Sequence, residues 1–278
     1  MQRDFDLIIS YDGTREHYLS EMLPFLDFRG LSPAAPSIER QTTTLATQHG
    51  LIQTSPNVRF QETSVKAKFN LSAKSHQQFY INRQEVIRAF KRVKPFYIST
   101  TYDPNRRWLV VCDDGIDIDK DNEKKDKEFE VDFKALKGLA ESKFTTSKDF
   151  NLASEHFNVG MNIPSKDYIP YSFNSKSFTV FNGSDVALDT IQFDYQVKMK
   201  LSGKDVKITN KTTNESIVIN GSVKNTQVIK CINQYVFIDD KIASKKGRFP
   251  SLEIGDNQFV IENATSVQID FITRFYYV

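Results

Sequence analysis

The strongest constraint on the fold is an alternation of apolar and polar residues that runs without a fault from Ile191 to Leu201. Successive side chains of a β-strand point to opposite faces of a sheet. The run therefore predicts a long strand with one buried and one exposed face. A second alternating run, Val65 to Leu71, predicts another such strand far away in the sequence.

The C-terminal half continues as short apolar runs separated by turn residues. The turns are expected at Asn182-Gly183, Ser202-Gly203, Asn220-Gly221 and Gly255-Asp256. Many short strands with regular turns predict a β-sandwich. The segment Phe249–Asn257 is interpreted as an edge strand and a tight turn, which leads into a return strand at 258–261.

One helix is expected in the N-terminal half, over residues 75–93. Ser75 and Gln78 form a capping-box pattern at its start, and Pro95 follows its end. Its apolar face is expected to contain Phe79, Val86, Phe90 and Val93. Strands are predicted on its C-terminal side at 96–101, 107–112 and 128–133.

The 278 residues suffice for two domains, which we place at 1–150 and 151–278. Residues 1–56 are expected to add strands or an arm to something else rather than to build a core of their own. The two cysteines, Cys112 and Cys231, are isolated and indicate folding in a reducing compartment. The N-terminus does not have the pattern of a signal peptide, and no apolar stretch approaches the roughly 20 residues of a membrane helix.

Charge is distributed unevenly, although the net charge of the chain is only +2. Residues 59–107 carry 11 basic and 3 acidic side chains, whereas residues 113–132 carry 10 acidic and 4 basic ones. Two solvated faces would explain this pattern. The alternative is a bipolar domain that forms head-to-tail contacts with its own copies, and such contacts close into rings. The candidate interface residues are Arg88, Lys91, Arg92, Arg106, Arg107, Asp117, Asp119 and Asp121.

Patterns of catalytic or metal-binding residues are weak in this sequence. The acids from Asp117 to Glu128 match the ligand spacing of a calcium-binding EF-hand loop, but Asn122 replaces the required glycine and no helical pattern flanks the loop. The four histidines are scattered, and Cys112 is interpreted as a core residue. No catalytic, cofactor or metal site is predicted. The basic residues near the end of the helix are explained by the helix dipole, so sequence-specific nucleic-acid binding is not expected.

Several short segments, in their order and spacing, resemble the distal tail protein of long-tailed siphophages. The segments in the N-terminal half are 65–71, 75–93, 95–98, 107–110 and 138–142. Those in the C-terminal half are 178–183, 206–213 and 249–257. The residues around His49 depart from the family, which leaves the path of an N-terminal arm open.

The resemblance implies a mainly β protein with an N-terminal ring-forming (belt) domain, sandwich-like with one helix, and a C-terminal galectin-like β-sandwich. Such proteins are not enzymes. They form hexameric hubs at the virion tail tip, where they leave a channel for DNA. The implied partners are further copies of the chain, the tail-tube protein, a tail-associated lysin or hub protein and a receptor-binding protein, but no membrane. The implied place of synthesis is the bacterial host cytoplasm.

Two other functions stay open from the sequence alone. A lectin-like adsorption protein would bind sugar through an aromatic platform, for which Tyr168, Tyr171 and Tyr235 are candidates. A polysaccharide hydrolase would need a pair of carboxylates, and no pair stands out.

Overall fold

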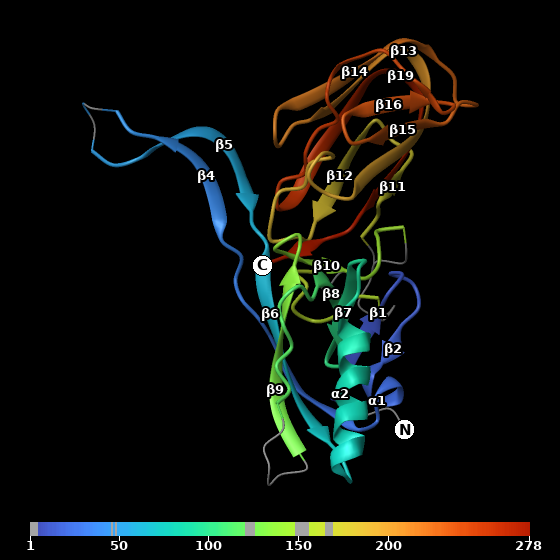
Figure 1. The fold of residues 1–278 in the computed structure, drawn as a ribbon. Helices are drawn as coiled ribbons and strands as arrows, with labels where there is room; N and C mark the ends of the chain where they lie inside the picture. Colours follow the sequence, from blue (N-terminus) through green and yellow to red (C-terminus); the bar gives the residue numbers. More distant parts are fainter. Residues whose placement is uncertain (1–4, 46, 48, 120–125, 148–155, 165–168) are drawn as a thin grey trace. The chain divides into compact units, whose positions relative to one another are not determined.

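The computed structural model describes residues 5–45, 47, 49–119, 126–147, 156–164 and 169–278. The chain divides into two compact units (Figure 1). Unit 1 consists of Met1–Ala140 together with Val278, and unit 2 of Glu141–Tyr277. The division lies ten residues before the domain boundary that we expected at residue 150.

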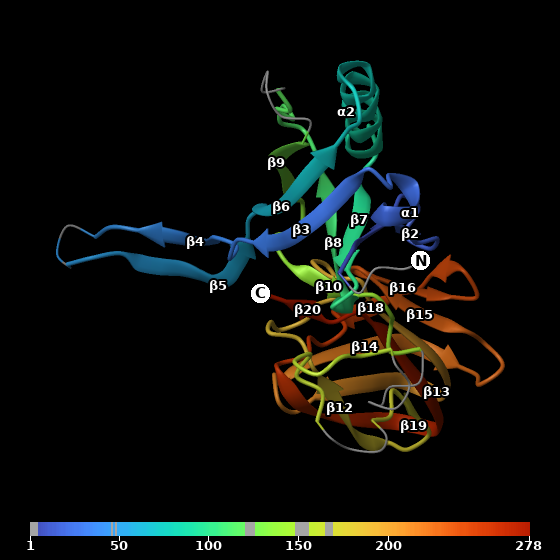
Figure 2. The same cartoon turned by 90° about the horizontal axis from the view of Figure 1, so that it is seen from below.

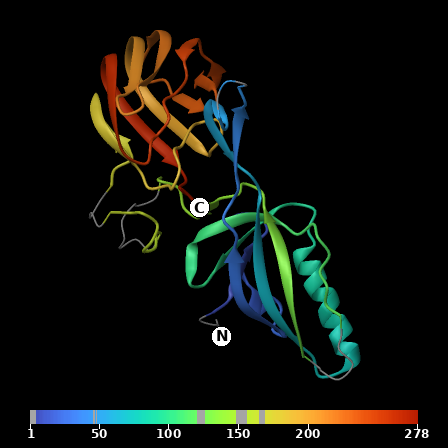
Figure 3. The ribbon, with the colours of Figure 1, turned by 90° about the vertical axis from the view of Figure 1, so that its left-hand side faces the viewer.

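Unit 1 is built on one antiparallel sheet in the order β2-β1-β7-β8-β9-β6-β3. Its helix α2 lies beside the strands of that sheet (Figure 3). Its elements are β1 (Leu7–Ser10), β2 (His17–Tyr18), α1 (Leu19–Met22), β3 (Leu26–Pro33), β4 (Ile38–Thr43), β5 (Ile52–Phe60), β6 (Thr63–Ser72), α2 (His76–Phe90), β7 (Phe96–Thr100), β8 (Asp103–Val111) and β9 (Asp126–Ala135).

Aromatic side chains fill the core of unit 1 where α2 packs on the sheet. Phe90 contacts Phe69 of β6 and Phe133 of β9, with both pairs of ring centroids 5.3 Å apart. The N-terminal segment contributes to this core as well, through residues such as Leu7 and Leu26. The expectation that residues 1–56 add strands to another part of the chain is therefore confirmed for β1 and β3, which pair with β7 and β6 and share the core of unit 1.

The start of α2 confirms the predicted cap, because the Ser75 side chain accepts a hydrogen bond from the Gln78 backbone N–H at 3.1 Å. Phe79, Val86 and Phe90 are buried as expected. The prediction for Val93 is wrong: the helix ends at Phe90, and Val93 lies beyond it with a fully exposed side chain. Losing helical geometry removes Val93 from the apolar face that the spacing assigned to it.

Unit 2 is an antiparallel β-sandwich in which two long strands, β13 and β19, run through both layers. Its elements are β11 (Ser172–Phe173), β12 (Ser177–Asn182), β13 (Tyr195–Asn210), β14 (Glu215–Val223), β15 (Ile229–Ile232), β16 (Tyr235–Ile238), β17 (Lys241–Ile242), β18 (Lys245–Gly247), β19 (Gly255–Thr273) and β20 (Tyr276–Tyr277). A short strand, β10 (Ala140–Ser142), precedes them where the chain enters the unit.

The first half of β13 pairs with β15 and with the second half of β19, and its second half pairs with β14 and with the first half of β19. The bend between the halves lies at Gly203. A Cβ atom there would be 2.1 Å from the backbone oxygen of Asn263 on β19. Only glycine allows the two strands to approach so closely at the corner.

Three details of unit 2 differ from the sequence predictions. The turns expected at Ser202-Gly203, Asn220-Gly221 and Gly255-Asp256 lie within β13, β14 and β19. The long strand begins at Tyr195, because the Asp189 carboxylate accepts the backbone N–H groups of Ile191 and Gln192 and folds this segment into a turn. Segment 249–254 is not the first arm of a hairpin, because its backbone pairs at Leu252 with Leu188 instead.

Buried asparagines, which the sequence analysis missed, hold these loops. Asn257 donates to the carbonyl oxygens of Glu253 (2.8 Å) and Gly255 (3.0 Å), and it accepts from the side chain of Asn210 (3.0 Å). Asn182 donates to Leu252 O at 3.3 Å. All three side chains are fully buried, and each donates to backbone carbonyl oxygens of segment 249–255.

Candidate assembly surfaces

The β4–β5 hairpin extends away from the sheet of unit 1 as a two-stranded ribbon (Figures 1 and 2). Within the described residues its strands pair only with each other. Every residue of β4 is exposed, and the hairpin also exposes apolar side chains at Ile38 (46 %), Leu45 (50 %) and Leu51 (70 %). Because an isolated two-stranded ribbon is marginally stable in water, this hairpin is suited to a partner surface.

Strand β3 lies at one edge of the unit 1 sheet and pairs with β6 on one side. A bulge between Phe28 and Gly30 interrupts this pairing, and the strand ends at Pro33. Bulges and prolines blunt the edges of sheets against unselective pairing. The edge is thus open along only part of its length.

The predicted interface cations at the end of α2 all have partners within unit 1. Arg88 Nη1 lies 2.6 Å from Glu85 Oε1. Lys91 Nζ donates to the carbonyl oxygens of Asp113 (2.7 Å) and Asp114. The guanidinium of Arg92 lies 4.6 Å from the centre of the Tyr11 ring. All three residues are nevertheless exposed.

The other two predicted cations lie on β8. Arg106 Nε lies 2.7 Å from Asp103 Oδ2, with both side chains mostly covered. Arg107 is buried, with its guanidinium 3.8 Å above the Tyr97 ring and one N–H donated to Gly13 O at 2.9 Å. These contacts give Arg107 a role in holding the loop that contains Gly13.

The basic and acidic segments meet within one chain, because β6 pairs with β9. Their register places Lys66 opposite Asp132 and Lys68 opposite Glu130. Lys66 Nζ also lies 3.2 Å from Glu130 Oε1. Part of the charge complementarity that the sequence shows is thus satisfied inside unit 1. A groove of about 520 Å³ lies over these strands, lined by Arg29, Lys68, Phe69, Glu128, Phe129 and Glu130.

The acidic loop between β8 and β9 is described in part. Asp117 and Asp119 are exposed, whereas Asp121 lies outside the described residues. Glu128, the last position of the calcium-loop pattern, belongs to β9 and pairs with Asn70. In the described parts of the chain, no three His, Cys, Asp or Glu side chains gather into a group that could hold a metal ion.

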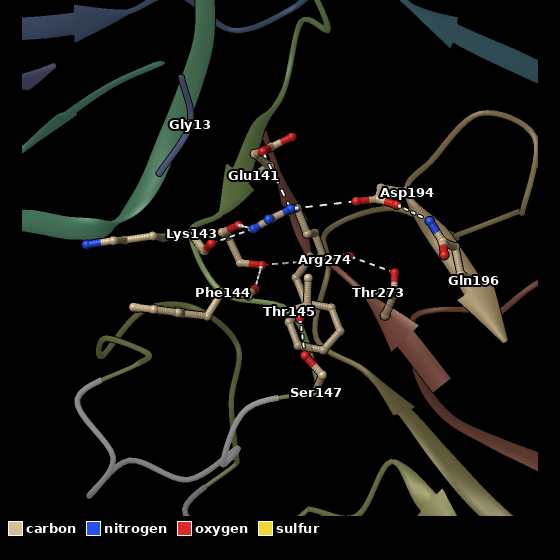
Figure 4. Close-up of polar contacts among 12 residues, drawn as sticks. Gly13, Glu141, Lys143, Phe144, Thr145, Ser147, Asp194, Gln196, Thr273 and Arg274 are labelled. Carbon is tan, nitrogen blue, oxygen red and sulfur yellow. Dashed lines mark hydrogen bonds and ion pairs between the residues drawn. The ribbon is translucent and has the colours of Figure 1, made fainter. Parts of the chain in front are cut away.

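Arg274 fastens the segment that enters unit 2 to the last strands of that unit (Figure 4). It donates to the carbonyl oxygens of Ser142 (2.8 Å) and Lys143, and its Nε lies 3.7 Å from carboxylate oxygens of Glu141 and Asp194. Ser142 N–H donates to Phe275 O at 2.8 Å beside it. Residues 141–143 are therefore held at several points to residues 274–275.

The aromatic candidates for sugar binding differ in exposure. Tyr171 is buried, and its hydroxyl donates to Phe181 O at 2.7 Å. Burial raises the pKa of this phenol far above its ordinary value. Tyr235 is 45 % exposed on β16, and Tyr168 lies outside the described residues.

Both cysteines are free and buried. Burial raises the pKa of the Cys112 thiol and raises that of Cys231 to about 12. A thiol that stays protonated at neutral pH is a poor nucleophile. Among the described helices, none is long and apolar enough to cross a membrane.

Comparison with known proteins gives a family for part of the chain and a fold for nearly all of it. Residues 17–135 match the family model of the phage tail protein RIFT-related domain. No curated protein matches the sequence significantly.

Solved structures of phage tail components share the architecture. The crystal structure of SPP1 Dit (gp 19.1), described as a paradigm of the hub adsorption apparatus in phages infecting Gram-positive bacteria, has a TM-score of 0.60 at 10 % identity, covering 97 % of this chain and 99 % of that one. A chain of the phage P2 baseplate, activated with Ca, matches with a TM-score of 0.41 at 11 % identity over 97 % and 98 % of the two chains. The Sr-activated form gives 0.38 at 10 % identity over 96 % and 97 %. The likeness to SPP1 Dit establishes a shared fold and agrees with the resemblance found in the sequence.

Proposed function

From the phage tail domain that residues 17–135 match, we propose that this chain is a structural, non-enzymatic component of a siphophage tail tip. In this proposal six copies of unit 1 form a ring that connects the tail tube to the adhesion apparatus and leaves a channel for DNA. Unit 2 is a galectin-like sandwich that docks the remaining parts. The match of unit 1 to a tail-protein domain carries the proposal, and the fold shared with SPP1 Dit supports it.

The β4–β5 hairpin supplies the physical basis for assembly. Its exposed apolar residues and unpaired outer edges cost free energy in a monomer, and a neighbouring copy can cover both. Burial of apolar area contributes about 25 cal/mol per Å². Exposed ion pairs contribute only about 0–1 kcal/mol each. The hairpin should therefore contribute more to the ring than any single charge of the candidate interface.

The proposed charge contacts keep a secondary role. Among the described residues, the exposed members of the candidate set are Arg88, Lys91, Arg92, Asp117 and Asp119. Charges of this kind steer association and fix register more than they hold a finished complex together. We propose that they set the rate of ring closure and the order of subunits.

The proposed partners outside the ring are the tail-tube protein, a tail-associated lysin or hub protein and a receptor-binding protein. The protein is proposed to be made in the host cytoplasm and to act in the virion. A carbohydrate-binding role in adsorption is the second candidate function, and the exposed ring of Tyr235 is the observation that favours it.

A hairpin replacement tests the ring without touching the core. Residues 40–58 are replaced by Asn-Gly, which closes a two-residue turn between the paired residues Glu39 and Arg59. The control replaces Arg88 by Ala. Negative-stain imaging and light scattering should show six-fold rings for the parent and for Arg88→Ala, but monomers for the replacement. A folded parent that gives no rings, alone or with purified tail-tube protein, contradicts the proposal.

A further inference from the structure

One outer face of the unit 2 sandwich gathers lysines and aromatic rings on neighbouring strands. It is formed by β13, β15 and β16, which are adjacent in the sheet (Figure 1). The alternate residues Val197, Met199, Cys231 and Val236 point inward and are buried. The residues between them form what we call the lysine face: Gln196, Lys198, Lys200, Lys230, Tyr235 and Phe237.

The charges on the lysine face are only partly compensated. Lys198 lies directly opposite Lys230 in the β13–β15 register. Like charges at such positions destabilise a sheet. Lys230 Nζ is 2.8 Å from Asp240, whose side chain is largely exposed. Lys198 and Lys200 make no ion pair with any residue that the structure describes.

The carboxylate opposite Lys198 in the β13–β19 register accepts a hydrogen bond from another residue. Asp270 on β19 lies opposite Lys198 and accepts a hydrogen bond from the Ser172 hydroxyl. The surrounding segment is basic as well, because residues 195–250 carry 11 basic and 4 acidic side chains, a net charge of +7. The rest of the chain is therefore net acidic, since the whole carries +2. An excess of positive charge within this segment attracts anions to it.

One aromatic ring lies in the row of the lysines, and a second lies in the next row of the same face. Lys230 is paired with Phe237 across β15 and β16, and Ile232 with Tyr235. The rings of Tyr235 and Phe237 are 6.3 Å apart at 51°. An exposed aromatic face packs well on the C–H face of a sugar ring, because both are apolar and flat. Neighbouring strands lie ~4.8 Å apart, so one row across the three strands runs Lys198, Lys230, Phe237, with two adjacent cations followed by a ring.

We propose that the lysine face binds a linear anionic glycan. Its acidic groups contact Lys198, Lys200 and Lys230, and its sugar rings pack on Tyr235 and Phe237. A glycan is favoured over an acidic protein because the exposed ring of Tyr235 and the half-buried ring of Phe237 lie on the same face as the cations. The inference rests on the carbohydrate-binding candidate and is independent of the ring.

Titration calorimetry of the full chain tests this proposal with three probes of matched length: polygalacturonate oligosaccharides, neutral dextran and poly-glutamate. We expect polygalacturonate to bind and to weaken as salt rises, because the cations contribute. Dextran should show no measurable binding, and poly-glutamate should bind at least about fivefold more weakly. The double variant Lys198→Ala, Lys230→Ala should lose about tenfold in affinity for polygalacturonate.

A second pair of lysines provides the matched control. Lys211 and Lys246 lie off the lysine face, and both are exposed. Removing both as Lys211→Ala, Lys246→Ala changes the net charge equally and should alter affinity by less than about twofold. Tyr235→Ala should weaken polygalacturonate but not poly-glutamate.

Four outcomes overturn the inference. If the control variant Lys211→Ala, Lys246→Ala loses as much affinity for polygalacturonate as Lys198→Ala, Lys230→Ala, binding depends on net charge alone. Poly-glutamate that binds as tightly as polygalacturonate means an acidic protein partner. If dextran binds as tightly as polygalacturonate, the site recognises neutral sugar, and the proposed carbohydrate-binding function still holds. If neither sugar binds, both the lysine-face inference and the carbohydrate-binding function are contradicted.

Discussion

Replacing Arg274 by Met should destabilise unit 2 strongly, because this one side chain fastens the segment that enters the unit. The change removes the hydrogen bonds to the carbonyl oxygens of Ser142 and Lys143 and takes the guanidinium away from Glu141. Glu141 is 2 % exposed, so its carboxylate cannot turn to water instead.

The size of the effect follows from these contacts. A hydrogen bond to a charged group contributes about 1.5–3 kcal/mol, and breaking a buried ion pair costs about 3–5 kcal/mol. Arg274 itself is 19 % exposed and Asp194 46 % exposed, which reduces the contribution of that second carboxylate. We expect a loss of about 2–4 kcal/mol in the free energy of unfolding of unit 2.

Amide hydrogen exchange read by mass spectrometry measures this loss segment by segment. Peptides covering residues 141–147 and 271–277 should exchange about 30- to 1,000-fold faster in the variant, and peptides from unit 1 should not change. The control Lys207→Met removes an ion pair with Glu262 that is about half exposed on both sides, and should cost about 0–1 kcal/mol.

A double variant measures the interaction energy between Arg274 and Glu141. Arg274→Met combined with Glu141→Gln should cost at least about 1 kcal/mol less than the sum of the single changes. If Arg274→Met exchanges like the parent, or if the two changes are additive, Arg274 does not hold the entry segment in the way that the geometry indicates.

Three further predictions concern unit 2. Gly203→Ala should cost about 1–3 kcal/mol, because a Cβ would collide with the Asn263 backbone, and a urea midpoint equal to that of the parent would refute this. Burial raises the pKa of Glu215, but hydrogen bonds from Ser251 and Arg248 outweigh this effect, so the pKa in the folded protein lies below the ordinary 4.5. The ionised carboxylate therefore stabilises the fold above pH 4.5, and this contribution is lost as the pH falls through the lower folded pKa. In Glu215→Gln, the melting temperature should depend less on pH over that window. Cys231 should not react with a thiol reagent in the native protein at pH 8, because its pKa is about 12, and fast labelling without unfolding would show the burial to be wrong.

Local patterns in the sequence predicted those parts of the fold in which a single periodicity decides the structure. The alternation at 65–71 gave β6, and the cap at Ser75 gave the start of α2. In both cases the structure of the segment follows from its own residues, so the prediction did not require knowledge of any distant segment.

The errors arose where a side chain distant from the pattern, or a capping group beside it, decided the backbone. Ile191 fits the alternating pattern, yet Asp189 captures the N–H of Ile191 in a turn. Segment 249–254 has the sequence of a hairpin arm, yet the side-chain amides of Asn182 and Asn257 donate hydrogen bonds to its carbonyl oxygens at Leu252 and Glu253. These contacts join residues up to 70 positions apart, which no local pattern reveals.

The candidate interface was predicted from charge alone. The charge of a segment does not show whether its partner lies in the same chain or in another copy. The sequence shows a basic and an acidic segment, but only the β6–β9 pairing shows that they face each other within one chain. The exposed apolar hairpin was expected as an arm without a defined path. Its surface properties depend on which residues the sheet leaves uncovered, and this follows from the tertiary structure.

The subunit count of the assembled protein tests the central claim most directly. Native mass spectrometry of the full chain, over a range of protein concentrations, should show a species of six copies, about 192 kDa from a chain mass of 32.0 kDa. Imaging of the same sample should show closed rings. A folded chain that stays at 32.0 kDa at every concentration, and also in the presence of purified tail-tube protein, would contradict the ring.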